Sequence, residues 1–211
     1  MRTAGLLVVS LLAVVALAGC GQRAPSVQPS APAAPAWRSV ATAEDRTRLR
    51  DWRAAWVEGL RQARAAGHGP AIAREGALLE PDAALSGAAL PDYLYRCRVT
   101  KLGSQGTGGL AYVAYPAFEC RVRAEGALQH FAKLTGSQRP VGHIYPDGDA
   151  RRVFLGTLIL GDERMAMRYG QDRERDVVGV VERIGPRRWR LVLPYPRFES
   201  KVDVIDLVPL G

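Results

Sequence analysis

The chain has 211 residues, of which 47% are apolar and 24% are charged, values close to the average for globular proteins. This composition excludes wholesale disorder and a multi-span membrane protein, and the length allows one domain of ordinary size plus a targeting segment. The formal net charge is +8, and only three of the 29 basic residues are lysines: Lys101, Lys133 and Lys201. We interpret the charge as a solvated basic surface, with attraction to phosphate-bearing envelope lipids or acidic partners as the alternative.

Residues 1–19 have the pattern of a bacterial secretory signal. Arg2 gives a positive start, and the apolar run from Gly5 to Ala16 is too short for a comfortable membrane span. The run closes with Leu17-Ala18-Gly19-Cys20, which looks like the lipobox of bacterial lipoproteins, where the cysteine thiol is acylated. Gly21 follows, rather than the aspartate that resembles an inner-membrane retention signal. We therefore predict lipidation of Cys20, a lipid anchor in the membrane and a location at the periplasmic face of the outer membrane.

Lipidation of Cys20 leaves Cys97 and Cys120 as an even pair in an oxidising compartment. Both lie at positions that alternation directs to the inner face of a strand. We predict a disulfide that stabilises the fold by about 3 kcal/mol through loop closure.

The two cysteines also predict a hairpin register. If Cys97 faces Cys120, then Val99 faces Phe118 and the chain reverses at Gly108-Gly109, which suits a tight turn. The Gly-rich stretch 103–109 is interpreted as the hairpin loop, because it lacks the strand-to-helix setting of a phosphate-binding loop.

Two segments precede the predicted sheet. Residues 20–41 are rich in Pro, Ala, Ser and Gln and are interpreted as a lipidated, disordered tether. Residues 42–90 form a helical segment that begins at the N-cap Thr42. Its apolar stripe at helical spacing is expected to pack on the protein's own sheet and comprises Leu49, Trp52, Trp56 and Leu60. A second short helix is expected between Pro70 and Leu79.

Residues 91–211 alternate with a period of two between turn signals, which predicts about nine strands. The expected strands cover 93–101, 112–122, 128–135, 140–145, 151–160, 165–169, 176–184, 188–195 and 202–208. The predicted fold class is therefore mainly β with an N-terminal α-helix. We expect a small antiparallel meander that closes into a lipocalin-like barrel, and a two-sheet sandwich is the alternative. The strand at 154–160 is apolar on both faces, so we expect the tryptophan stripe to cover it.

No catalytic residue is assigned. His143 lies near Asp147 and Asp149 in sequence, but the aspartates belong to a turn, so we predict no metal site and no cofactor. A hydrolase would need a nucleophile beside a base, and chance proximity of Ser137 and His143 is the one arrangement that the sequence offers. Asp203 and Asp206 are three positions apart, an odd number, so they should face opposite sides of one strand. This spacing weakens the hypothesis of a glycosidase with paired carboxylates.

Two candidate binding surfaces remain. The polar cluster Thr135, Ser137, Gln138 and Arg139 is a candidate binding loop at the barrel mouth, and otherwise a turn that satisfies its own backbone. Arg187, Arg188 and Arg190 are the densest basic cluster. Alternation predicts a solvent face for Arg188 and Arg190, and binding of an anionic envelope component is the functional alternative.

Several runs resemble the domain-of-unknown-function 4893 family of bacterial secreted proteins: 95–98 (YRCR), 101–103 (KLG), 112–116 (YVAYP), 133–142 (KLTGSQRPVG), 153–157 (VFLGT) and 181–190 (VERIGPRRWR). The similarity extends from about Thr42 to Leu210. It implies envelope export and carries no established activity, so it transfers no site residue. A more distant likeness, of architecture alone, is to periplasmic protease inhibitors of the lipocalin-like class.

The leading hypothesis is a lipid-anchored, non-catalytic envelope module that binds or interacts with another envelope protein or an anionic envelope component, and not with nucleic acid. A calycin-like carrier of a small apolar ligand is the second hypothesis, a protease-inhibitor-like protein is another alternative, and an unrecognised hydrolase ranks last. A carrier predicts a hollow barrel, whereas an interaction module predicts a filled one.

Overall fold

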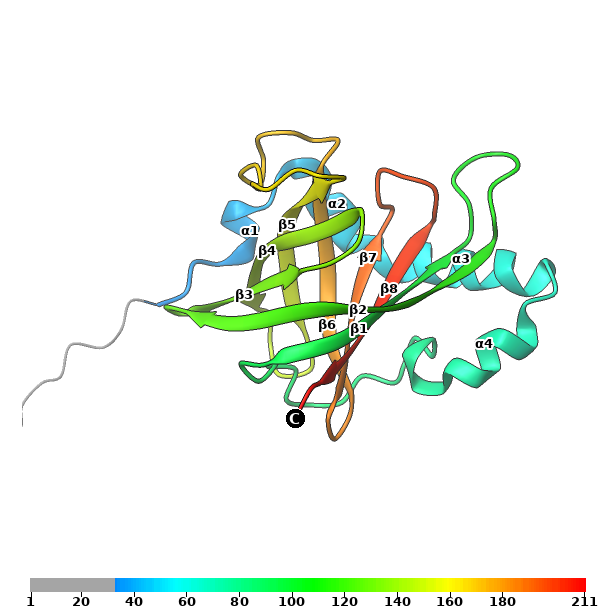
Figure 1. Ribbon diagram of the computed structural model, residues 1–211, viewed down its shortest axis with the longest axis horizontal. Helices are drawn as coiled ribbons and strands as arrows, with labels where there is room; N and C mark the ends of the chain where they lie inside the picture. The colour runs from blue at the N-terminus through cyan, green and yellow to red at the C-terminus, as the bar shows by residue number, and fades with distance from the viewer. Residues whose placement is uncertain (1–32) are drawn as a thin grey trace, which may run out of the picture. The chain divides into compact units, whose positions relative to one another are not determined.

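The computed structural model describes residues 33–211, which form a closed antiparallel barrel with helices packed on one side (Figure 1). The helices are α1 (Trp37–Val40), α2 (Ala43–Arg50), α3 (Trp52–Ala65) and α4 (Gly69–Glu75), followed by the 3₁₀ turn η1 (Gly76–Leu78). The strands are β1 (Leu94–Leu102), β2 (Tyr112–Glu125), β3 (Leu128–Lys133), β4 (Gln138–Pro146), β5 (Arg152–Leu160), β6 (Asp176–Gly185), β7 (Arg188–Pro194) and β8 (Val202–Pro209).

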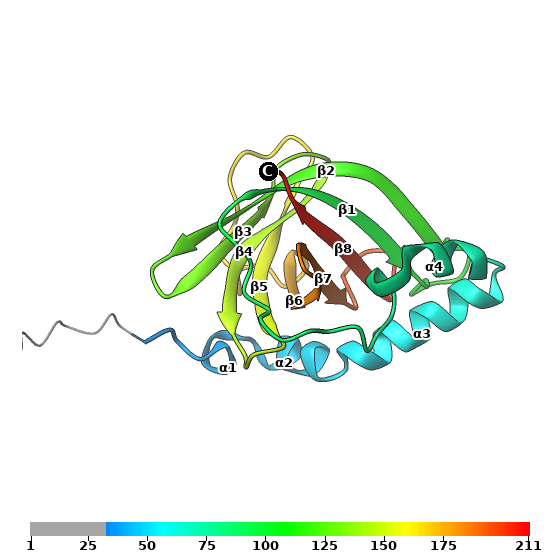
Figure 2. The same ribbon diagram turned by 90° about the horizontal axis from the view of Figure 1, so that it is seen from below.

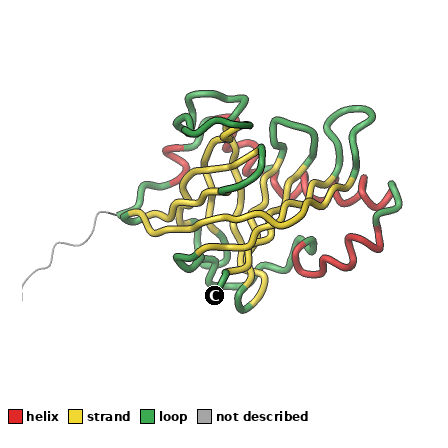
Figure 3. The backbone as a smooth tube through the Cα atoms, viewed as in Figure 1, coloured by secondary structure: helices red, strands yellow, loops and turns green. Residues whose placement is uncertain are grey.

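Each strand pairs with the next along the chain, and β8 closes the barrel on β1 (Figure 3). The predicted meander and its closure are therefore confirmed, and the sandwich alternative is wrong. Closure gives every strand two neighbours, so the sheet has no open edge.

The ninth predicted strand, over 165–169, does not form. This stretch lies in the β5–β6 loop, where Met165 is 84% exposed. One contact within the loop and one to α2 hold it instead: Arg175 Nη1 lies 2.6 Å from Glu163 Oε2, and the Tyr169 hydroxyl donates to Asp45 at 2.6 Å. Five alternating residues are too short a pattern to distinguish a strand from a loop with one anchoring aromatic side chain.

The predicted disulfide is present, with Cα atoms of Cys97 and Cys120 5.9 Å apart, but the predicted register is wrong by two residues. Cys97 faces Phe118 and Tyr95 faces Cys120, so the disulfide joins the strands diagonally. A bulge between Arg98 and Thr100 shifts the register again toward the hairpin end. A shift of two residues keeps each side chain on its original face, and both cysteines are fully buried inside the barrel.

The helix predicted from Thr42 is present but broken. Thr42 caps α2, its hydroxyl accepting the Asp45 N–H at 3.1 Å, and Asp51 separates α2 from α3. Ahead of them, α1 lies inside the range predicted as tether, because Trp37 is buried and its indole N–H donates to Asp147 at 2.8 Å. Cys20 and the part of the predicted tether up to residue 32 lie outside the described residues.

The helices run along one side of the barrel (Figure 2). Trp52 and Trp56 are buried against the barrel, which confirms that the stripe packs on the protein's own sheet. The main partners of α3 are β7, β8 and β1, and α2 packs on β6, so β5 is not the principal strand covered. Among residues 33–211, no helix has the length and apolar character needed to cross a membrane.

A buried charge cluster lies beneath the helical segment. Arg190 is fully buried, and its guanidinium donates to Glu182 at 2.6 Å and 2.9 Å. The same group lies 4.3 Å from the ring centroid of Trp56. It also donates to the backbone carbonyls of four residues at and after η1: Ala77, Leu78, Glu80 and Pro81.

The predicted solvent face at Arg188 and Arg190 is therefore wrong. Arg188 is half-buried and donates to Asp206 at 2.8 Å, so only Arg187 of the three is exposed. Alternation assigned these side chains correctly to the outer face of the barrel, but it contains no information about which segment covers that face.

Replacing Arg190 tests how strongly this cluster stabilises the fold. Arg190→Met should lower the free energy of unfolding by about 3–5 kcal/mol, because Glu182 then stays buried without its main partner. The exposed control Arg187→Met should stay within about 0.5 kcal/mol of the wild type. Urea denaturation measures both, and equal effects of the two substitutions would contradict the role given to Arg190. Adding Glu182→Leu to Arg190→Met should recover part of the loss, since the unpaired charge is then removed.

Candidate binding site at the barrel mouth

The interior of the barrel divides into a filled end and a hollow end. Bulky side chains pack the filled end around the disulfide, and they include Tyr95, Val122, Phe131, Ile144, Phe154, Trp189 and Leu207. At the other end lies a cavity of about 350 Å³. That volume is at the lower end of the range for small-molecule sites, about 300–1,000 Å³.

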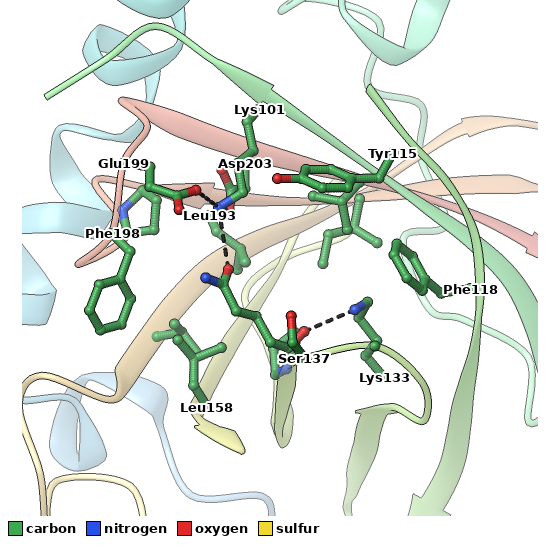
Figure 4. Close-up of a pocket in the computed structure, with 17 residues that line it drawn as sticks. Lys101, Tyr115, Phe118, Lys133, Ser137, Leu158, Leu193, Phe198, Glu199 and Asp203 are labelled. Atoms are coloured by element: carbon green, nitrogen blue, oxygen red, sulfur yellow. Dashed lines mark hydrogen bonds and ion pairs between the residues drawn. The ribbon is translucent and has the colours of Figure 1, made fainter. Parts of the chain in front are cut away.

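The cavity combines apolar walls with charged groups (Figure 4). Its apolar lining includes Val99, Leu158, Val177, Leu193 and Ile205 from five different strands, and the aromatic side chains Tyr115, Phe118 and Phe198. Its polar lining includes Lys101, Lys133, Gln138, Glu199 and Asp203. Apolar walls with a few placed polar groups are typical of sites that bind small molecules.

Lys101 is the centre of a charge cluster on one side of the cavity. Its Nζ lies 2.8 Å from Glu199 Oε2 and 3.7 Å from Asp203 Oδ2, and it donates to Gln138 Oε1 at 3.3 Å. Burial alone would lower the pKa of Lys101, but Asp203 and Glu199 raise it above the ordinary value. Burial also raises the pKa of Asp203, although Lys101 opposes the shift. Lys101 is therefore a cation already neutralised by the protein.

Lys133 lies across the cavity from Glu199 and Asp203 (Figure 4). It is 5% exposed, its Nζ donates to the backbone carbonyl of Gln138 at 2.9 Å, and it lies 3.8 Å from the ring centroid of Phe118. Within residues 33–211 it forms no ion pair with a carboxylate. Burial, with the nearby Arg139 and Lys101, lowers the pKa of Lys133 to about 8.

Gly136 makes room for the Lys133 amine. Its backbone φ is +90°, and a Cβ there would lie 2.7 Å from Lys133 Nζ and 2.9 Å from a ring carbon of Phe118. Glycine is favoured at this position both by the left-handed backbone and by the close approach of two side chains.

The predicted binding loop divides between the cavity and the scaffold. Ser137 and Gln138 line the cavity. Thr135 instead accepts the Glu119 N–H at 3.2 Å, and Arg139 donates to backbone carbonyls of the neighbouring loops, those of Gly136, Gly161 and Glu163.

The sequence interpretation did not identify Lys101 and Lys133 as site residues. A signal was present, because two of the three lysines in an arginine-rich chain occur within strands. Lys101 is also four positions after Cys97, so alternation along the strand predicts that both side chains point to the inner face.

The residues weighed for catalysis are not brought together. Ser137 lies just before β4 and His143 six residues further along, a separation of about 20 Å for an extended strand. His143 instead lies 3.4 Å from Glu125, with its ring beside that of His130. Asp203 lines the cavity while Asp206 pairs with Arg188 outside it, so the two carboxylates lie on opposite faces as predicted. In the part of the chain described, no cluster of three or more His, Cys, Asp or Glu side chains is placed to hold a metal ion.

In a comparison with protein families, the model described as "Domain of unknown function (DUF4893)" matches residues 37–207. The chain therefore belongs to this family, as the resemblance of its motifs indicated. Searches of the curated proteins and of the solved structures gave no significant match.

The two cavity lysines should titrate in opposite directions from their ordinary pKa of 10.5. Lys133 should have a pKa of about 8 and Lys101 a pKa above 10.5. Carbon-13 reductive methylation of the three lysines, followed by an NMR titration, measures this, and Lys101→Arg and Lys133→Arg assign the signals. A Lys133 signal that titrates at or above 10.5 would show that its amine is solvated or paired with a carboxylate.

Proposed function

We propose that this family member is a lipid-anchored envelope protein whose barrel mouth binds a small, partly apolar molecule without chemical conversion. The observation that supports it is the division of the barrel interior into a filled end and a cavity of about 350 Å³. The sequence alone ranked an interaction module ahead of a carrier. The cavity favours the carrier, since a filled interior was the feature expected of a pure interaction module.

The walls of the cavity are rigid, so the binding site has its shape before a ligand enters. The strands that supply Val177, Leu193 and Ile205 are covered outside by α2 and α3, so these positions sit in a wall packed on both faces. A wall of this kind holds its side chains in fixed rotamers, which lowers the entropy lost when a ligand binds. The aromatic side chains Tyr115, Phe118 and Phe198 at the cavity offer broad apolar contact to an entering molecule.

The envelope location rests on the sequence and on the cysteine chemistry. The apolar N-terminal run closes with a lipobox-like motif at Cys20, and the remaining cysteines form a buried disulfide. Disulfides persist in oxidising compartments such as the periplasm, so the pair is consistent with export.

Filling the cavity should abolish binding. Val99 is half-buried and lines the cavity, so Val99→Trp should occupy the space that a ligand would use. The affinity for the neutral fluorescent probe N-phenyl-1-naphthylamine should fall about tenfold or more because the pocket is blocked. This change corresponds to a loss of about 1.4 kcal/mol or more in binding free energy. The control Val57→Trp adds the same ring at a position on α3 that is 47% exposed and should bind like the wild type. Equal probe binding by both variants would place the probe outside the cavity and contradict the proposal.

Lipidation can be tested separately from binding. Cys20→Ala should abolish incorporation of radiolabelled palmitate and prevent membrane anchoring, because the acyl acceptor is lost. The control Cys97→Ala with Cys120→Ala removes the disulfide but leaves the acceptor, so it should still be labelled. Continued labelling of Cys20→Ala would refute the assignment of the lipobox.

A further inference from the structure

The cavity holds one cation that the described protein does not neutralise. Its two carboxylates, Glu199 and Asp203, lie next to Lys101, from which they are separated by 2.8 Å and 3.7 Å. Lys133 comes from β3 on the other side, and among the described residues its amine contacts a carbonyl oxygen and the face of Phe118. The charged groups are therefore separated across the cavity: Lys101 lies with two carboxylates on one side, and Lys133 lies on the other without a carboxylate from the described part of the chain.

A buried ammonium group without a counter-ion is unfavourable, because it loses hydration that no full opposite charge replaces. The Phe118 ring compensates only in part through a cation–π contact. An ammonium group has three N–H donors, and the carbonyl of Gln138 occupies one of them. Among the described residues, the other two donors have no oxygen or nitrogen acceptor, and the Phe118 ring lies beside the amine.

We propose that the ligand of the barrel mouth is an amphipathic monoanion, a medium-chain carboxylate, whose head pairs with Lys133 Nζ while its hydrocarbon chain lies on the apolar wall formed by Val99, Leu158 and Ile205. This inference rests on the proposed function and specifies its ligand class.

The surroundings of Lys133 favour a single negative charge. The nearest other cation, Arg139, donates to three backbone carbonyls and so has few donors left for a ligand. Glu199 and Asp203 face the same cavity and would repel a second charge on the ligand. A phosphate monoester usually needs several charged donors, whereas a carboxylate can be held by one ammonium group together with the apolar wall.

The ionisation of Lys133 gives the inference a signature in pH. Besides burial, the groups that lower its pKa are Arg139 on β4 and Lys101 on β1. The other titratable groups that face the same cavity are Tyr115 on β2, and Glu199 and Asp203 on the opposite side. A carboxylate binds the protonated amine, so affinity should be full at pH 7 and fall as pH rises above about 8. A bound anion should in turn raise the pKa of Lys133, with uptake of protons at pH 8–9.

The experiment compares decanoate with decanol on the purified full chain, by calorimetry and by displacement of N-phenyl-1-naphthylamine. At pH 7 decanoate should bind about tenfold or more tightly than decanol, the effect of one charge-assisted pair. Lys133→Met should remove that preference and leave decanol within about twofold, whereas Lys133→Arg should keep the preference and lose the decline in affinity above pH 8. The matched control Lys201→Met removes the third lysine, which does not line the cavity, and should behave as the wild type.

The outcomes separate this inference from the proposed function. If decanol and decanoate bind equally, or if Lys133→Met leaves decanoate binding unchanged, the monoanion assignment is overturned while small-molecule binding stands. Tighter binding of decyltrimethylammonium than of decanoate would assign the opposite charge and also overturn it. If the wild type binds no probe, no alcohol and no carboxylate, the proposed function and the monoanion assignment both fail. The unfolding midpoint of Lys133→Met, expected at or above that of the wild type because a buried unpaired charge is lost, shows that the variant is folded.

Discussion

The buried guanidinium of Arg190 is the interaction on which the arrangement of helices and barrel depends. It joins Glu182 on β6 to the backbone after η1 and to the ring of Trp56 on α3. The side chains of Arg190, Glu182 and Trp56 are fully buried. The helical segment is thereby held on the outside of β6, β7 and β8. Beside this charge cluster, β6 also presents apolar residues that pack with those of the helices, including Val178 and Val180. The same wall forms one side of the cavity, so the cluster under the helices also fixes the shape of the binding site.

The barrel was predictable because its causes are local. Alternation with a period of two, short turn signals and an even pair of inward cysteines all occur within a few residues of sequence. The register of β1 and β2 was not predictable from the cysteines, because a diagonal disulfide and a bulge at Arg98 satisfy the same alternation. The burial of Arg190 was missed for another reason: the segment that covers it lies more than 100 residues earlier in the chain.

The site was predictable only where polar residues cluster in sequence. Ser137 and Gln138 stood out as a polar run before a proline, and they do line the cavity. Lys101 and Lys133 were missed because each lies near the end of a strand that contains other polar residues, so the strand pattern does not distinguish it from them. Their importance arises when closure of the barrel brings β1 and β3 to the same interior, a long-range event that no short window of sequence contains.

The contrast between arginine and lysine follows from where each is used. Arg139 and Arg190 each bond several backbone carbonyls, a task that suits a planar group with five donors in fixed directions. The cavity instead contains Lys101 and Lys133, whose compact ammonium groups leave more open space. A lysine can also lose its proton when buried, whereas an arginine remains charged. With a pKa of about 8, Lys133 in the empty cavity is mostly protonated at pH 7 and becomes neutral only as the pH rises above about 8, and an entering anion favours the charged state. The choice of lysine makes the same position tolerable when vacant and attractive to a carboxylate when protonated.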